Sequence, residues 1–222
     1  MKDLLSKQAS LRQKLLLKLE NFEASLTKPD FDVIVSHCEI NDHHGVGILL
    51  KRIFANQKNI LSIRSTNLYD GKQAFGDCNL HFSFEGLSQL EILTKVQLLL
   101  ARKKPRRILS VPYYSDDVLI SIILKDLFNL PLCTYLMDDQ NIYANGISDD
   151  NMRELLQKSD LCLGISQELC QAYEKKFGCQ FWFLPPVAPE KLIQKSVSLP
   201  INESVQNLEG VLVGNMLESG MA

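Results

Sequence analysis

The first part of the chain carries leucines at mixed three- and four-residue spacings, with lysines and other polar residues between them. This periodicity predicts an amphipathic helix over residues 3–26, ended by Lys28 and Pro29. The leucines that define it are Leu4, Leu5, Leu11, Leu15, Leu16 and Leu19. We expect this helix to pack on its own domain. Because lysines lie between the leucines, peripheral contact of residues 1–26 with an anionic membrane surface is the alternative.

From Phe31 onward, short apolar runs alternate with helical segments, which is typical of β-α units around a parallel sheet. The pattern predicts an α/β fold: a Rossmann-like, mostly parallel sheet of about six or seven strands with helices on both faces. The predicted strands are residues 31–38, 60–64, 80–84, 107–111, 132–137, 161–165 and 180–184.

Several helix starts can be recognised between these strands. Ser88 and Glu91 have the spacing of a capping box ahead of an apolar segment. Ser115, Ser148 and Ser166 are each followed by acidic residues, which favour the positive end of a helix. The sequence therefore predicts helices that begin at these four serines.

The regular pattern loosens after Pro185 and Pro186, and Gly210–Gly214 is a fresh apolar run near the end of the chain. We predict an N-terminal helix (residues 1–28), a main domain (29–199), and a linker with one further strand (200–222). A single strand cannot form a domain, so this strand either adds to the sheet of the main domain or, as we expect, opens a second domain that the chain does not contain.

Charge and apolar content exclude some classes of protein. The formal net charge is -2, with 24 Lys and Arg against 26 Asp and Glu, which argues against nucleic-acid binding by bulk charge. The basic run at residues 102–107 has no interleaved aromatic residue, so we expect a solvated helix end there. The apolar runs are shorter than the roughly 18 residues that a membrane span requires.

Cysteine usage bears on the cellular compartment. The chain has six cysteines but no C-x-x-C pair, and no Cys/His spacing typical of zinc sites. We predict reduced, mostly buried thiols, no metal site, and a cytoplasmic location, with membrane association through the N-terminal helix as the alternative.

Ligands of an open parallel sheet bind beyond the carboxyl ends of its strands, so polar residues directly after the predicted strands are candidate site residues. They are His43, His44, Gly45 and Gly47 after the first strand, Tyr113 and Tyr114 after the strand at 107–111, Asp138, Asp139 and Asn141 after the strand at 132–137, and Ser166 after the strand at 161–165. We predict that these segments line one cleft at a single edge of the sheet.

These residue types suggest particular chemistry. His43 or His44 could act as a general base, although adjacent loop histidines are also common as plain surface residues. Gly45 and Gly47 open a helix, where missing side chains would let a ligand approach free backbone N–H groups. A pair of aspartates such as Asp138 and Asp139 could share a proton or bind sugar hydroxyls, and no third ligand in the sequence completes a metal site.

The order of elements from Arg107 to Val187 resembles the N-terminal domain of GT-B glycosyltransferases, in particular family-4-like enzymes. The resemblance rests on "NLPLCTYLMDD", "SDLCLGISQEL" and "QFWFLPPV", on the loop with Gly45 and Gly47, and on "GVLVGN" at residues 210–215. With Pro131 aligned, Met137 stands where such enzymes usually have a histidine, and Asp138 takes the aspartate position. The resemblance implies a half that cradles the acceptor, with the nucleotide-sugar donor held toward a second domain.

The favoured hypothesis is the acceptor-side domain of a glycosyltransferase, which moves a sugar from a nucleotide-sugar donor to a saccharide or lipid-linked acceptor without a cofactor. Backbone N–H groups at residues 45–47 would stabilise the transition state, while His43, His44 or Asp138 would contact sugar hydroxyls. We expect this chain alone to be inactive. The alternative is a non-catalytic acceptor-binding or partner module. A third hypothesis is an NADP-dependent reductase, in which Arg64 and Ser65 hold a 2′-phosphate.

Overall fold

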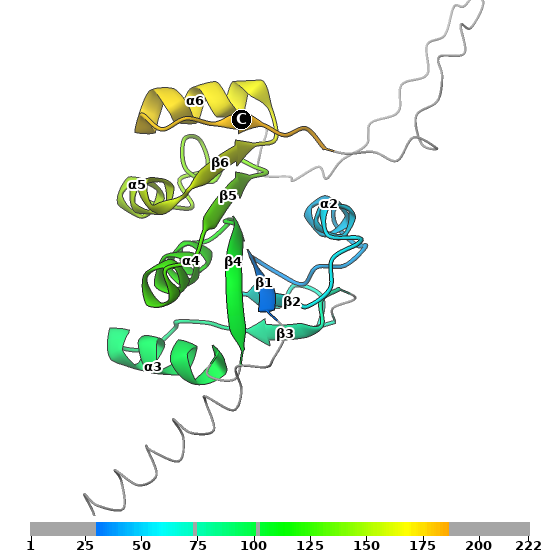
Figure 1. Cartoon of the computed structure of the whole chain (residues 1–222). Coiled ribbons are helices and arrows are strands. Elements are labelled where there is room, and N and C mark those ends of the chain that lie inside the picture. Colours follow the sequence, from blue (N-terminus) through cyan, green and yellow to red (C-terminus); the bar gives the residue numbers. More distant parts are fainter. Residues whose placement is uncertain (1–29, 73–74, 101–102, 187–222) are drawn as a thin grey trace, which may run out of the picture. The chain divides into compact units, whose positions relative to one another are not determined.

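The computed structural model describes residues 30–72, 75–100 and 103–186. In this part of the chain a seven-stranded, all-parallel sheet has the order β3-β2-β1-β4-β5-β6-β7 (Figure 1). The strands are β1 (Asp30–Ser36), β2 (Ile60–Arg64), β3 (Cys78–His81), β4 (Lys104–Val111), β5 (Leu132–Leu136), β6 (Leu161–Gly164) and β7 (Trp182–Phe183). The predicted Rossmann-like α/β fold is confirmed. The predicted N-terminal helix and the strand at 210–214 lie outside the described residues.

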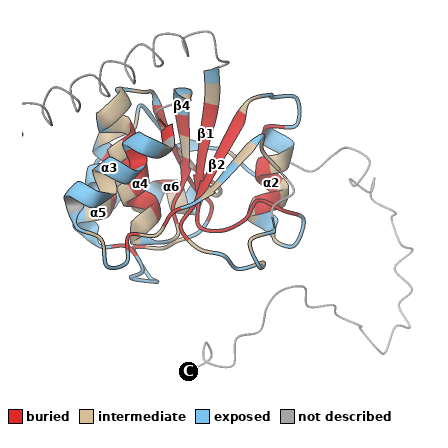
Figure 2. Cartoon of the chain, turned by 90° about the horizontal axis from the view of Figure 1, so that it is seen from below, coloured by how far each residue is buried: buried red, intermediate tan, exposed pale blue. Residues whose placement is uncertain are grey.

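Helices cover the two faces of this sheet unequally. The helices are α2 (Gly45–Ile53), α3 (Gln89–Leu100), α4 (Ser115–Phe128), α5 (Asp149–Lys158) and α6 (Gln167–Phe177). Figures 1 and 2 place α2 on one side of the sheet and α3, α4 and α5 on the other. Buried residues of α6 belong to the same apolar core as those of α4 and α5. Among the described helices, α2 is therefore alone on its face.

Alternating side chains of the strands build two separate cores, one on each face of the sheet. On the face covered by four helices, Val33 and Val35 of β1 pack with residues of β2, α4 and α5. On the other face, Ile34 of β1 packs with Leu50 and Phe54 at α2 and with Tyr135 of β5. The central strands are buried, as Figure 2 shows, because helices lie over both of their faces.

The basic run predicted as a solvated helix end has a different role. Strand β4 begins at Lys104, earlier than predicted, so Arg106 and Arg107 are strand residues. Both guanidinium groups pair with Asp32 of β1, which is only 1% exposed; Arg107 Nε and Nη2 lie 2.9 and 2.8 Å from its two carboxylate oxygens. A register shift between Phe31 and Asp32 accompanies this pairing. The prediction is corrected in part: these residues lie in a strand and pair with a buried carboxylate, which needs cationic partners, but Lys104, Arg106 and Arg107 are exposed as expected.

Three of the four predicted helix starts have the expected capping contacts. Ser88 and Glu91 exchange hydrogen bonds between their backbone N–H groups and side chains. The hydroxyls of Ser148 and Ser166 accept the N–H groups of residues 151 and 169. Helix α4 differs, because it begins at Ser115 itself. No helix of the described residues is long and apolar enough to cross a membrane.

Candidate functional site at the carboxyl edge of the sheet

The segments that follow β1, β4, β5 and β6 share one edge of the sheet. Since all seven strands are parallel, the loops that begin at their carboxyl ends emerge on the same side. His37, directly after β1, lies 4.1 Å from Tyr113 between ring centroids, which joins the loops after β1 and β4. Gly146, in the loop after β5, approaches the backbone oxygen of Tyr113. These loops lie at one edge of the sheet, as predicted, whereas the cleft that they were expected to line together stays a prediction.

An aromatic cluster lies over the start of helix α2. The imidazole of His44 stacks on the ring of Tyr69 with centroids 5.4 Å apart and an interplanar angle of 9°. His43 stacks on the same ring at 5.5 Å and 23°. Tyr69 comes from the loop after β2, and the sequence reasoning missed it because no motif marks that loop.

Glu39 holds Tyr69 in place. This carboxylate is fully buried, and it accepts hydrogen bonds from the backbone N–H groups of Leu68 at 2.9 Å, Tyr69 at 3.3 Å and Gly71 at 2.7 Å. Burial alone would raise the pKa of Glu39, but the N–H donors outweigh it and lower the pKa. The loop after β2 is thereby wrapped around an ionised side chain from the loop after β1.

His44 acts as the N-cap of α2. Its Nδ1 accepts the backbone N–H of Gly47 at 3.2 Å, so the ring proton lies on Nε2, which donates to the backbone oxygen of Glu39 at 2.8 Å. Both ring nitrogens of His44 are therefore engaged by the backbone. His43 is exposed, and its imidazole has no hydrogen-bond partner in the described part of the chain. Of the two histidines predicted as general bases, His43 is the accessible one.

The two predicted glycines differ in what surrounds them. A Cβ at Gly45 would meet no atom within 4 Å, so the first residue of α2 is open to a ligand. A Cβ at Gly47 would lie 2.3 Å from the backbone oxygen of Asn41. Gly47 is therefore required for the close packing of α2 against the preceding loop, a folding role that its sequence context did not reveal.

Three possible metal ligands meet beside this helix start. The three residues are His37, Cys38 and His44, and each has a donor atom within 4.8 Å of a donor atom of the other two. The Sγ atom of Cys38 lies 3.2 Å from Nε2 of His37 and 3.6 Å from Nε2 of His44. Burial raises the pKa of Cys38 to about 12, with help from the charges of Glu39 and Asp117. A metal would need the thiolate and would have to displace the hydrogen bond from His44 to Glu39. The absence of a metal site stays a prediction.

Tyr113 and Tyr114 are positioned by Asp117 of α4. One carboxylate oxygen of Asp117 accepts both of their backbone N–H groups at 2.9 Å. Burial raises the pKa of Tyr113, and the charge of Asp138 adds to the shift. Tyr114 is 43% exposed, so its ring is accessible at the edge of the sheet.

The remaining predicted residues differ in whether their side chains already form hydrogen bonds within the domain. Asp138 is exposed, and within the described residues its side chain accepts only the N–H of the next residue. Asp139 accepts the backbone N–H groups of Asn141 and Ile142, and the hydroxyl of Tyr173 donates to it at 2.9 Å. The buried amide of Asn141 donates to the backbone of residue 147 and to the carboxylate of residue 149. These two side chains, like the capping hydroxyl of Ser166, already hold the chain in place.

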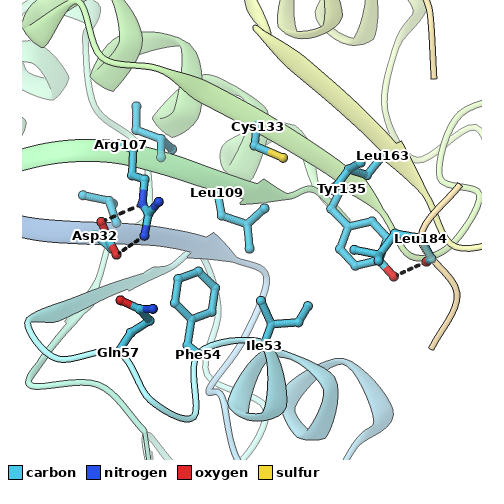
Figure 3. Close-up of a pocket in the computed structure, with 12 residues that line it drawn as sticks. Asp32, Ile53, Phe54, Gln57, Arg107, Leu109, Cys133, Tyr135, Leu163 and Leu184 are labelled. Carbon is cyan, nitrogen blue, oxygen red and sulfur yellow. Dashed lines mark hydrogen bonds and ion pairs between the residues drawn. The ribbon is translucent and has the colours of Figure 1, made fainter. Parts of the chain in front are cut away.

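A groove lies on the α2 face of the sheet. It has a volume of about 270 Å³ and is lined by α2-face side chains of β1, β4, β5 and β6 together with the end of α2 (Figure 3). No predicted site residue lines it among the described residues. Arg64, proposed for a 2′-phosphate, is buried and donates from Nε to Asn67 at 2.7 Å, which gives the reductase hypothesis no support.

Comparison with known proteins adds no family. The sequence matches no protein-family model, and it matches no curated protein. The carboxyl edge therefore has to be interpreted from its own geometry.

Proposed function

We propose that this chain is the acceptor-side domain of a glycosyltransferase that moves a sugar from a nucleotide-sugar donor to a saccharide or lipid-linked acceptor. The observation that carries the proposal is the pair of accessible polar groups, His43 and Asp138, on loops at one edge of a parallel sheet. Neighbouring polar side chains are engaged with the backbone, so these two are free to meet a ligand. Six unpaired cysteines suit a reducing, cytoplasmic setting.

The edge offers the chemistry that a sugar requires. The imidazole of His43 can accept a proton from an acceptor hydroxyl, and the carboxylate of Asp138 can accept hydrogen bonds from others. The exposed face of Tyr114 offers an apolar surface for the C–H side of a sugar ring. At Gly45 the N-terminus of α2 is open, and its N–H groups favour negative charge such as that of a phosphate.

Acceptor binding by the full chain tests this proposal. A panel of immobilised saccharides and lipid-linked saccharides is screened with the wild type, and binding is then measured for His43→Gln and Asp138→Asn. Each variant should weaken binding at least about tenfold, the loss expected for hydrogen bonds to charged or well-placed groups. Asp126→Asn is the matched control, because Asp126 is an exposed carboxylate near the end of α4, away from this edge.

Two outcomes would contradict the proposal. If no saccharide binds, or if both edge variants bind as well as the control, the acceptor site is not at this edge. We expect no nucleotide release when nucleotide sugars are added to the acceptor-bound chain, and release would show that this chain is catalytic by itself.

A further inference from the structure

The face of the sheet that carries α2 bears an apolar stripe beyond the reach of that helix. In the strand register, Leu109 of β4 lies beside Cys133 of β5, which lies beside Leu161 of β6. The next row places Leu163 of β6 beside Trp182 of β7. Paired residues of parallel strands point to the same face, so these side chains form one continuous apolar surface.

Two residues of this surface are exposed, while Leu109, Cys133 and Leu163 are half-buried. Trp182 is 57% exposed and Leu161 is 40% exposed. The groove of about 270 Å³ runs between this surface and the end of α2, with Phe54 and Leu109 along it (Figure 3). Strands of a parallel sheet are normally covered on both faces, and here four helices cover the opposite face, whereas α2 is alone on this one among the described helices. A covering element is therefore expected on this face.

The geometry points to residues 1–26 of the same chain as that element, docked along the groove through their apolar stripe. The stripe consists of Leu4, Leu11, Leu15, Leu19, Phe22 and Leu26, at spacings of three, four and seven residues. A helix over residues 3–26 would be about 36 Å long, and β1 is separated from β7 by four strand spacings, about 19 Å. One such helix can cross the whole exposed surface.

The point of attachment also favours this segment. Residues 1–29 join the sheet at Asp30, two residues before Asp32, and Asp32 with Arg107 borders one end of the groove (Figure 3). A helix that turns back at Lys28 and Pro29 thus starts at the groove. Residues 187–222 are the competing segment within the chain, but they lack a comparable stripe of regularly spaced leucines.

The sole tryptophan of the chain makes the test direct, because Trp182 belongs to the open surface. In the full chain, Leu15→Glu with Phe22→Glu is compared with the matched pair Gln13→Glu and Ala24→Glu, which adds the same charge to the opposite side of the helix. Acrylamide quenching of Trp182 and alkylation of Cys133 by iodoacetamide report the coverage. We expect the stripe variant to raise the quenching constant about twofold or more and the Cys133 rate about fivefold or more, with the control unchanged.

Buried Cys162 and Cys170 lie in the core on the opposite face and report folding, since they should stay unlabelled. If they become reactive, the milder pair Leu15→Ala and Phe22→Ala is measured in the same way. Equal quenching and labelling in stripe and control variants would overturn the proposal in favour of residues 187–222 or no cover. Protection that disappears when the wild type is diluted would overturn it in favour of a second copy of the chain.

Discussion

The stability of this domain should be almost independent of pH between pH 5 and pH 6, because two buried groups at the carboxyl edge titrate with opposite effects. His37 is the first. Burial, together with the charge of His44, lowers the pKa of His37 from 6.5 to about 4. Between these values the unfolded chain binds more protons than the folded one, so the contribution of His37 to stability rises with pH and is lost as the pH falls.

Asp117 acts in the opposite direction. Burial raises the pKa of this carboxyl group from 3.8 to about 6, although its hydrogen bonds lower it. Between these values the folded chain holds the extra proton, so the contribution of Asp117 falls as the pH rises. In the interval from pH 5 to pH 6 each group exchanges most of one proton, which corresponds to about 1 kcal/mol per pH unit, positive for His37 and negative for Asp117.

Two single variants should therefore show a dependence of the free energy of unfolding on pH that cancels in the wild type. Urea unfolding of His37→Gln at several values from pH 5 to pH 6 should show a free energy of unfolding that falls by about 1 kcal/mol per pH unit. Asp117→Asn should show a rise of about the same size, and the double variant should again be nearly flat. Slopes equal to that of the wild type in both single variants would refute the assignment of these two buried groups.

Four further predictions concern single contacts. Glu39→Gln should lower the free energy of unfolding by about 1–3 kcal/mol and speed amide exchange at residues 68–71. Exposed Glu85→Gln should do neither, because Glu39, unlike Glu85, accepts hydrogen bonds from that loop. Gly47→Ala should destabilise the fold by more than about 2 kcal/mol in urea unfolding, while Gly45→Ala changes stability by less than about 1 kcal/mol. Asp32→Asn should cost about 2 kcal/mol in the same assay, since two guanidinium groups lose their carboxylate; an unchanged midpoint would show that the pairing is only superficial. Zinc should fail to compete with a chromogenic chelator, because the thiol of Cys38 is protonated and His44 is engaged; stoichiometric uptake would contradict this.

The inner strands of the sheet could be located from the sequence, although β4 begins at Lys104 and not at the predicted residue 107, whereas the edge strand β3 was misplaced. The predicted strand at residues 60–64 matches β2, in which all five residues are buried and Ile60, Leu61 and Ile63 supply the apolar signal. At one edge, residues 80–84 were predicted, but β3 covers Cys78–His81. Phe82 and Phe84 pack into the core from the following loop, with ring centroids 5.0 Å apart. Apolar periodicity reports burial, and it cannot distinguish a buried loop residue from a strand residue.

For the polar residues of the candidate site, the sequence likewise predicts where a residue lies but not which contacts its side chain makes. The sequence placed His43, His44 and Asp139 at the correct edge, since that follows from strand order. It could not show that His44 caps a helix or that Asp139 accepts backbone N–H groups, because those contacts depend on the path of the loops. The contacts of Glu39 reach residues about 30 positions away, where no local spacing rule applies.

The separation between groove and carboxyl edge makes the two proposals independent of each other. The groove is lined by side chains such as Cys133 and Leu163, which point away from the plane of the sheet along its α2 face. The proposed acceptor groups, His43 and Asp138, lie on loops beyond the strand ends, and neither lines the groove. Uncovering the groove with Leu15→Glu and Phe22→Glu should thus leave saccharide binding unchanged. If saccharide binding fell together with the protection of Trp182, the N-terminal segment would have to contact the acceptor site as well. The docking groove and the acceptor site would then be parts of one surface.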